Sequence, residues 1–298
     1  MDINRIRWRL GSFGVWMVPG VLLATPVAEQ RIQFARIEGL GYSSLWSGEP
    51  SARSAVGGRE VFAEHGLMLA ATEQIIVGTG IANITRRDPM AMHTAAATLA
   101  EAYPERFILG LGGQTGDRPL SQLSDYLEEM DAAAVQALPG IEYPRLLAAL
   151  GPKAHHLAVH RADGVHPYMQ PVGHTAVARS LLGPAPLLVA HQYLLIESDA
   201  EAARNKLRSF FGSPESLPSG FYRNNYRRLG FTEADLSGGL SDRFVDALLA
   251  WGNPDRIAQH LREHLQVGGD HVLLQPLAHD LRAAVDQLEL LAPLLMEP

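Results

Sequence analysis

Three side chains that could move a proton lie close to the ends of apolar segments in this chain. Glu49 comes shortly after one such segment, and His166 and His191 lie in or beside two later ones. Carboxylate and imidazole groups act as general acids and bases in many enzymes, so Glu49 and His191 are candidates for that role. A buried, hydrogen-bonded histidine that only supports the fold is the commoner explanation of either imidazole.

A glycine between an apolar segment and a helix offers a second kind of chemistry, the binding of an anion. Residues 150–154 read Leu-Gly-Pro-Lys-Ala at such a junction. The free amide N–H groups of a helix N-terminus and its positive dipole end attract phosphate. Pro152 removes one donor, but Lys153 adds a full positive charge. We interpret the junction as a phosphate site, with a plain glycine turn beside a surface lysine as the alternative.

Metal, thiol and serine-hydrolase chemistry find little support in the sequence. The chain has no cysteine and no Gly-x-Ser-x-Gly segment. His156 and His160 have the spacing of two zinc ligands on one helix face, but no glutamate follows the first and no third ligand is placed by spacing. Walker-type spacing is also missing, as is a complete Gly-x-Gly-x-x-Gly after the first strand. We therefore expect no metal.

The composition is that of a globular protein with a large core. Of the 298 residues 47% are hydrophobic, and the net charge is −7. Because no basic block or interleaved basic and aromatic patch is present, nucleic acid is not an expected partner. The apolar run at residues 15–23 is broken by Pro19-Gly20, so we expect no signal peptide, no transmembrane span and no membrane partner. The expected location is cytoplasmic, and the expected partner is a small-molecule substrate.

Apolar strands alternate with helices along the whole chain, without a change of composition that would mark a domain boundary. Such alternation gives a parallel sheet with right-handed crossovers, and eight units can close into a (β/α)8 TIM barrel. An open doubly wound sheet is the alternative. We predict a single domain over residues 1–298, with an insertion at about residues 212–239. Strands are predicted at residues 13–17, 42–46, 75–77, 106–111, 144–150, 164–166, 187–196 and 271–275.

The helices are predicted from caps, first-turn prolines and apolar periodicity. The predicted ranges are 25–40, 59–71, 90–102, 120–138, 152–162, 175–182, 198–211, 241–251 and 254–267, followed by a final helix.

Two glycines interrupt the third strand, where packing would favour side chains. Gly78 and Gly80 follow Ile-Ile-Val, and Asp88-Pro89 then begins a helix. Glycine inside a strand marks a bulge, an unusual torsion or the close approach of another flat group. Our interpretation is that bare main chain lies flush beneath a planar ligand here. A bulged strand without a ligand is the alternative.

Several segments of the sequence together resemble a known family. It is similar to the luciferase-like monooxygenase superfamily and, within it, to the oxidoreductases that depend on the deazaflavin coenzyme F-420. The resemblance covers nearly the whole chain. The segments that carry it are residues 41–49, 78–81, 106–113, 151–153 and 161–164, and residues 222–225, 228–231 and 268–272 add subgroup character.

The resemblance implies a barrel with an insertion after strand seven, a flavin or deazaflavin held across the strand ends, a cis peptide between Gly80 and Ile81, and a homodimer. It also places the cofactor phosphate by residues 151–154. The insertion near Tyr222 is expected to cover the substrate. The expected cofactor-binding residues are Glu49, Gly80, Ile81, Asn83, Gly112, Gly113, Leu150, Gly151, Pro152, Lys153 and Ala154. The expected substrate-binding residues, chosen among aromatic and polar residues near predicted strand ends and in the insertion, are Trp16, Trp46, His166, Tyr222 and Asn225.

The chain also departs from the family pattern. Where relatives carry Asp-His after strand two, this chain has Glu49-Pro50; a Glu expected after strand four is missing at residues 114–116; and His191 stands where relatives tend to have Glu. We expect an oxidoreductase that transfers hydride between F-420 and an unidentified small organic substrate, with Glu49 and His191 as catalytic candidates. The alternatives are an FMN-dependent monooxygenase and a catalytically idle member that binds the cofactor.

Overall fold

The computed structural model describes residues 2–50, 57–211 and 220–296. At its centre a parallel sheet closes into an eight-strand barrel, because β10 (His271–Pro276) pairs with both β1 (Phe13–Trp16) and β8 (Leu187–Ile196). The barrel confirms the predicted TIM fold and contradicts the open doubly wound sheet. The strands between β1 and β8 are β2 (Ser44–Ser47), β3 (Ile76–Thr79), β4 (Ala82–Asn83), β5 (Phe107–Gly112), β6 (Arg145–Leu147) and β7 (Gly164–Val165).

The third barrel position is divided between β3 and β4. β3 pairs with β2 and the start of β5, whereas β4 pairs with the end of β5. The peptide between Gly80 and Ile81, which separates the two strands, is cis, as the family resemblance implied. A Cβ atom added to Gly48 would lie 2.4 Å from the carbonyl oxygen of Gly80, so only glycine fits beside this peptide.

Helices cover the outside of the barrel much as the sequence predicts. Asp88 begins α5 by accepting a hydrogen bond of 3.0 Å from the Ala91 N–H, with Pro89 in the first turn. The other helices that were expected are α3 (Val27–Gly39), α4 (Val61–Ala70), α6 (Pro119–Gln136), α7 (Pro152–Arg161), α8 (Val172–Leu182), α9 (Ala200–Phe211), α12 (Asp242–Leu248), α13 (Pro254–Gln266) and α14 (Leu281–Leu295), and α5 covers Pro89–Ala102. No helix in the described part of the chain is long and apolar enough to cross a membrane.

The structure differs from the sequence prediction in several elements, among them β4, α10 (Phe221–Arg228) and α11 (Glu233–Leu236), which were not predicted. Two short helices, α1 (Ile3–Leu10) and α2 (Pro19–Ala24), were not predicted, and the helix expected through residue 251 ends at Leu248. α1 is amphipathic and adds Ile6 and Leu10 to the apolar cluster inside the barrel. Residues 249–252 form β9 because the outer half of β8 extends beyond the barrel and offers a free edge, with Tyr193 paired to Leu249.

Two apolar layers hold the barrel together. One fills its interior, where Trp46, Ile108, Leu187 and Leu273 are fully buried. The other lies between the strands and the surrounding helices and includes Phe34 and many aliphatic side chains. Burial of this kind is the main stabilising contribution in a domain of this size.

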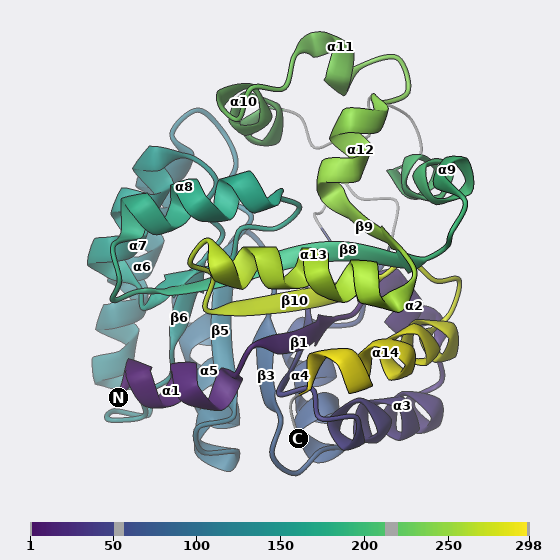
Figure 1. The fold of residues 1–298 in the computed structure, drawn as a ribbon. Coiled ribbons are helices and arrows are strands. Elements are labelled where there is room, and N and C mark those ends of the chain that lie inside the picture. The colour runs from purple at the N-terminus through teal and green to yellow at the C-terminus, as the bar shows by residue number, and fades with distance from the viewer. Residues whose placement is uncertain (1, 51–56, 212–219, 297–298) are drawn as a thin grey trace.

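The segment after β8 carries three helices that stand apart from the ring around the barrel. α10 (Phe221–Arg228), α11 (Glu233–Leu236) and α12 lie together at the top of Figure 1. Their buried side chains form a separate apolar cluster, centred on Tyr226 and Phe244, which also packs against Tyr193 of β8. The predicted insertion begins at residues 212–219, which lie outside the described residues; its remainder contains α10 and α11.

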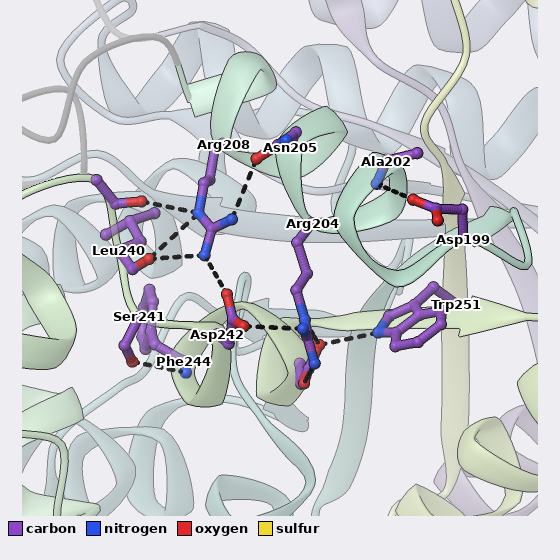
Figure 2. Close-up of polar contacts among 12 residues, drawn as sticks. Asp199, Ala202, Arg204, Asn205, Arg208, Leu240, Ser241, Asp242, Phe244 and Trp251 are labelled. Carbon is purple, nitrogen blue, oxygen red and sulfur yellow. Dashed lines mark hydrogen bonds and ion pairs between the residues drawn. The ribbon is translucent and has the colours of Figure 1, made fainter.

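Ion pairs fasten α9 to α12. Figure 2 shows Arg204 and Arg208 reaching from α9 toward Asp242. Arg204 also binds both carboxylate oxygens of Asp246, at 2.9 and 2.6 Å, and the indole N–H of Trp251 donates to the same carboxylate. Because two helices and β9 share this network, the segment is held in one orientation on the end of β8.

Candidate active site

Aromatic and polar side chains gather inside the barrel at the carboxyl ends of the strands, where TIM-barrel active sites lie. Trp16 ends β1, His166 and Tyr168 follow β7, His191 lies on β8 and Gln275 on β10. We call these five residues the floor. Their rings are in contact: the Trp16 and Tyr168 centroids are 4.9 Å apart, and those of Tyr168 and His191 are 4.3 Å apart.

The floor reaches across the barrel to the cis peptide. The Trp16 N–H donates to the carbonyl oxygen of Gly80 at 3.3 Å. A Cβ atom on Gly80 would lie 2.7 Å from Trp16 Nε1 and 3.1 Å from His166 Nε2, and one on Gly78 would lie 2.5 Å from three ring atoms of Trp46. The space beside both glycines is thus filled by protein rings. Our interpretation that bare main chain at these glycines lies flush beneath a planar ligand is therefore wrong.

His191 is fixed in one tautomer by its partners. The Met169 N–H donates to its Nδ1 at 3.4 Å, so Nε2 carries the proton and donates to Gln275 Oε1 at 2.7 Å. The same oxygen accepts from the Tyr168 hydroxyl at 3.1 Å, which in turn accepts from Tyr193. Burial holds the pKa of His191 well below its usual value. Both nitrogens of this catalytic candidate are therefore engaged within the protein.

His166 differs from His191 because one nitrogen has no partner. Its Nδ1 lies 3.0 Å from the Val189 carbonyl oxygen, which can only accept, so Nδ1 carries the proton. Nε2 is then a buried acceptor without a donor in the described part of the protein. Burial lowers the pKa of His166 to about 4, which leaves the imidazole neutral near neutral pH.

Glu49 lies at the barrel mouth, but its carboxylate is occupied. Arg87 donates to both oxygens at 2.7 Å, and the Asn83 N–H donates to one of them at 2.8 Å. The Glu49 main-chain N–H also binds the carbonyl oxygen of Ile81. With only 3% of its side chain exposed, Glu49 joins the end of β2 to β4 and so supports the cis peptide.

A second cluster forms at the N-terminus of α7. Gly151 is the N-cap, and the guanidinium of Arg228, from α10, lies over it: a Cβ atom on Gly151 would be 3.1 Å from Arg228 Nη1. Two buried histidines hold the carbonyls here, His155 at Gly151 and His174 at Leu150, each at 3.0 Å. No ion pair of Arg228 occurs within the described ranges.

This second cluster brings positive charges together. The amino end of α7 is the positive end of its dipole, Lys153 is exposed beside it, and Arg228 adds a third positive charge without a counter-ion among the described residues. Burial lowers the pKa of His155, and that of His174 to about 4, so neither ring supplies a charge at neutral pH. The cluster has the chemistry of an anion site.

The other predicted residues take supporting positions. Asn225 is buried in α10 and donates to Gln170 at 2.7 Å, which ties the segment above the barrel to the loop after β7. Asn83 accepts from Thr85 and lies against Gly113, whose φ of +82° suits glycine. Trp46, the register partner of Trp16 on β2, is fully buried, and its N–H donates to Ser44 Oγ, so its side chain packs in the barrel interior.

Sequence reasoning missed three residues that the structure brings to the site. Gln275, Gln170 and Arg228 hydrogen-bond or lie against predicted site residues, but none was singled out for its chemistry. For Gln275 a signal existed: in the predicted strand it shares the face of His271 and Leu273 at every second residue, and it lies at the carboxyl end. No group of His, Asp or Glu in the described ranges has the geometry to hold a metal.

Residues 9–125 match the family model described as luciferase-like monooxygenase, which confirms the resemblance predicted from the sequence. No curated protein matches the chain. Solved structures with the same fold include an F-420-dependent secondary alcohol dehydrogenase in complex with an F-420–acetone adduct, at a TM-score of 0.73 and 15% identity, with 96% of this chain and 99% of that chain covered.

Two further structures share the fold at low identity. The coenzyme F-420-dependent tetrahydromethanopterin reductase of Methanopyrus kandleri has a TM-score of 0.71 and 18% identity, covering 96% of this chain and 99% of that one. The oxygenating constituent of 3,6-diketocamphane monooxygenase from Pseudomonas putida, a type II Baeyer–Villiger monooxygenase in complex with FMN, has a TM-score of 0.65 and 12% identity, covering 97% and 100%.

Proposed function

From the match of residues 9–125 to the luciferase-like monooxygenase family, we propose that this protein is an oxidoreductase that transfers hydride between the deazaflavin F-420 and a small organic substrate. The fold neighbours include enzymes that use F-420 and one that binds FMN, so the fold accommodates either group. When bound, the deazaflavin supplies the hydride chemistry, and the protein orients the reactants and handles the proton.

The observation that carries this proposal is the anion site at α7. The helix N-terminus, Lys153 and Arg228 place three positive groups together without a counter-ion among the described residues, which suits a cofactor phosphate. The buried imidazoles of His155 and His174 hold the Leu150 and Gly151 carbonyls toward the protein. In this proposal residues 150–154 bind the phosphate from below and Arg228 binds it from above.

The ring of the cofactor would lie at the barrel mouth, above both the cis peptide and the floor, which are themselves in contact. Ile81, Asn83, Gly112 and Gly113 surround this position at the ends of β4 and β5. Glu49 then acts by holding β4 in place through Arg87, and its predicted role as an acid or base is not carried into the proposal. Tyr222, on α10, belongs to the cover above the substrate.

The test is a cofactor titration of the purified protein. We expect absorbance and fluorescence to report saturable binding of F-420, with a Kd at least tenfold below that for FMN. Binding weakened by inorganic phosphate would locate the cofactor at the anion site. Tight FMN binding without F-420 binding would instead support the monooxygenase alternative, which the FMN-containing neighbour favours. Binding without turnover of any enone, imine or nitro compound would support a cofactor-binding protein without catalysis.

A further inference from the structure

The helix α10 contacts both parts of the candidate site. At its C-terminal end the guanidinium of Arg228 lies over Gly151, the N-cap of α7. Two and three residues earlier, Tyr226 and Asn225 are buried and hydrogen-bond to residues 168–170, which we call the connector. One short helix therefore reaches from the anion site to the segment that carries Tyr168 of the floor.

Met169 is the centre of the connector, and its backbone joins α10 to the floor. The Tyr226 hydroxyl donates to the Met169 carbonyl oxygen at 2.7 Å, and the Met169 N–H donates to His191 Nδ1 at 3.4 Å. The φ of Met169 is +57°, a left-handed conformation that a residue with a side chain rarely adopts. Such a conformation persists where the surrounding contacts enforce it. The hydrogen bond from Tyr226 and the burial of the Met169 side chain in the apolar cluster of α10 are two such contacts.

The residues on either side of Met169 are attached in the same double way. Gln170 accepts from Asn225 Nδ2 at 2.7 Å and donates to the Tyr168 carbonyl oxygen at 3.2 Å. The Tyr168 ring belongs to the floor, where its hydroxyl donates to Gln275. The backbone of the connector thus links the position of α10 to two floor side chains, those of Tyr168 and His191.

The C-terminal end of α10 carries a charge that an anion would neutralise. Within the described residues, the guanidinium of Arg228 has a single hydrogen bond, to Asn225 Oδ1 at 3.4 Å, and no ion pair. It lies against the positive end of the α7 dipole, which also carries Lys153. Because like charges repel, this cluster opposes the docking of α10 when no anion is bound. An anion removes the repulsion and therefore shifts α10 toward the docked position.

We propose that α10 couples the two parts of the site. An anion bound by Arg228 holds the helix in place, and Tyr226 and Asn225 then hold the connector. The connector in turn keeps Tyr168 and His191 in the floor, so Tyr226 and Asn225 are positioning residues. This inference rests on the proposed function for the identity of the anion, a cofactor phosphate. It goes beyond that function by setting an order of binding, in which the cofactor completes the floor and the substrate binds afterwards.

Tyr226→Phe tests the positioning role without any ligand, because the variant loses the hydroxyl group and keeps the ring. Tyr42→Phe is the matched control, since Tyr42 is also buried and donates to a backbone carbonyl oxygen, that of Leu288, at 2.8 Å. In ¹⁵N-histidine-labelled protein, the Nδ1 resonance that is lost in His191→Asn belongs to His191. We expect this resonance to shift in Y226F, where Met169 is released, and to stay in place in Y42F. An unchanged resonance in Y226F would overturn the positioning role.

Hydrogen exchange in the presence of inorganic phosphate tests the coupling. A ligand that binds only the docked state slows exchange through undocking by the factor 1 + [L]/Kd, so phosphate at about ten times its Kd should slow the amides of α10 by about tenfold. We expect the same factor for the connector in the wild-type protein. In Arg228→Gln neither segment should slow, and in Y226F only α10 should slow. Sodium chloride at equal ionic strength controls for screening.

The outcomes separate this inference from the proposed function. If phosphate slows α10 but not the connector in the wild-type protein, the coupling is wrong and the anion site stands. If phosphate slows neither segment, the coupling is wrong even where F-420 binds. If F-420 does not bind while phosphate slows both segments by one factor, the proposed function is wrong and the coupling is supported.

Discussion

The indole of Trp46 lies against the backbone of Gly78 on the neighbouring strand, in the space that a side chain there would fill. Trp46 is paired in register with Gly78, its N–H is bound to Ser44, and its ring centroid is 5.5 Å from that of His166. The large side chain and the missing one are complementary, and Trp46 in turn lies beside His166 of the floor.

Gly78→Ala is therefore expected to destabilise the protein. The added methyl group would lie 2.5 Å from the Trp46 ring, and overpacking of this kind costs about 1–3 kcal/mol. Thermal and urea unfolding measure the loss. Gly173→Ala, in α8 with no atom near the added carbon, is the matched control and should be neutral or stabilising. Partial recovery in the double variant with Trp46→Phe would assign the loss to this contact; an unchanged G78A would contradict it.

Glu49 and Arg87 are expected to act on stability. Removing one partner of a buried ion pair leaves an unpaired charge or donor, so Arg87→Met should lower the free energy of unfolding by about 3 kcal/mol. The Nε of Arg86 is 3.7 Å from Glu49 and its side chain is 45% exposed, so Arg86→Met should change the free energy of unfolding by less than about 1 kcal/mol. Glu49→Gln should also unfold at lower urea concentration. A fully stable E49Q that binds cofactor but cannot turn over would instead support an acid or base role.

Arg228 is expected to contribute to anion binding at α7. Arg228→Gln should weaken the binding of F-420, and of inorganic phosphate as its competitor, by about tenfold, since a charged hydrogen bond contributes about 1.5–3 kcal/mol. Its neighbour Arg227, which pairs with Glu233, provides the control as Arg227→Gln. The loss in R228Q should shrink as salt concentration rises. Equal effects of the two variants would remove Arg228 from the site.

The buried histidines are expected to make the fold sensitive to acid. Burial lowers the pKa of His271 to about 4 and that of His264 to about 3, against about 6.5 in an unfolded chain. Between these values the unfolded state binds more protons, so stability is greatest above pH 6.5 and falls as pH falls. Each such histidine adds a slope of up to about 1.4 kcal/mol per pH unit. Urea unfolding from pH 7.5 to 4.5 measures it, and His264→Gln should reduce the slope; an unchanged slope would show that His264 does not contribute.

The barrel could be predicted because its signals are local. Each strand is a short apolar run, and helix starts such as Asp88-Pro89 carry both a cap and a proline. The two main errors have non-local causes. α1 is helical because its apolar face meets the barrel interior, and residues 249–252 are extended because β8 offers them an edge. Neither partner is visible in the segment itself.

The candidate site was predicted only in part for a similar reason. Alternation along strands placed Trp16, His166 and His191 at the mouth, but it could not show which imidazole nitrogens are hydrogen-bonded within the described part of the protein. That distinction depends on Met169, Val189 and Gln275, which are remote in sequence. Likewise Gly78 and Gly80 were recognised as unusual for a strand, but the side chains that leave no room for a Cβ atom there come from other parts of the barrel.

The extended β8 has a consequence for how this chain could diversify. Its first half belongs to the barrel and its second half pairs with β9, so the segment that covers the mouth continues the barrel sheet and is not joined to it by a flexible loop alone. Because α12 leads directly into β9, the sheet fixes the orientation of α12. Replacement of the segment between β8 and α13 would then exchange the cover of the barrel mouth and leave the barrel strands unchanged. This segment is therefore the natural unit to exchange when a different substrate preference is to be introduced on the same barrel.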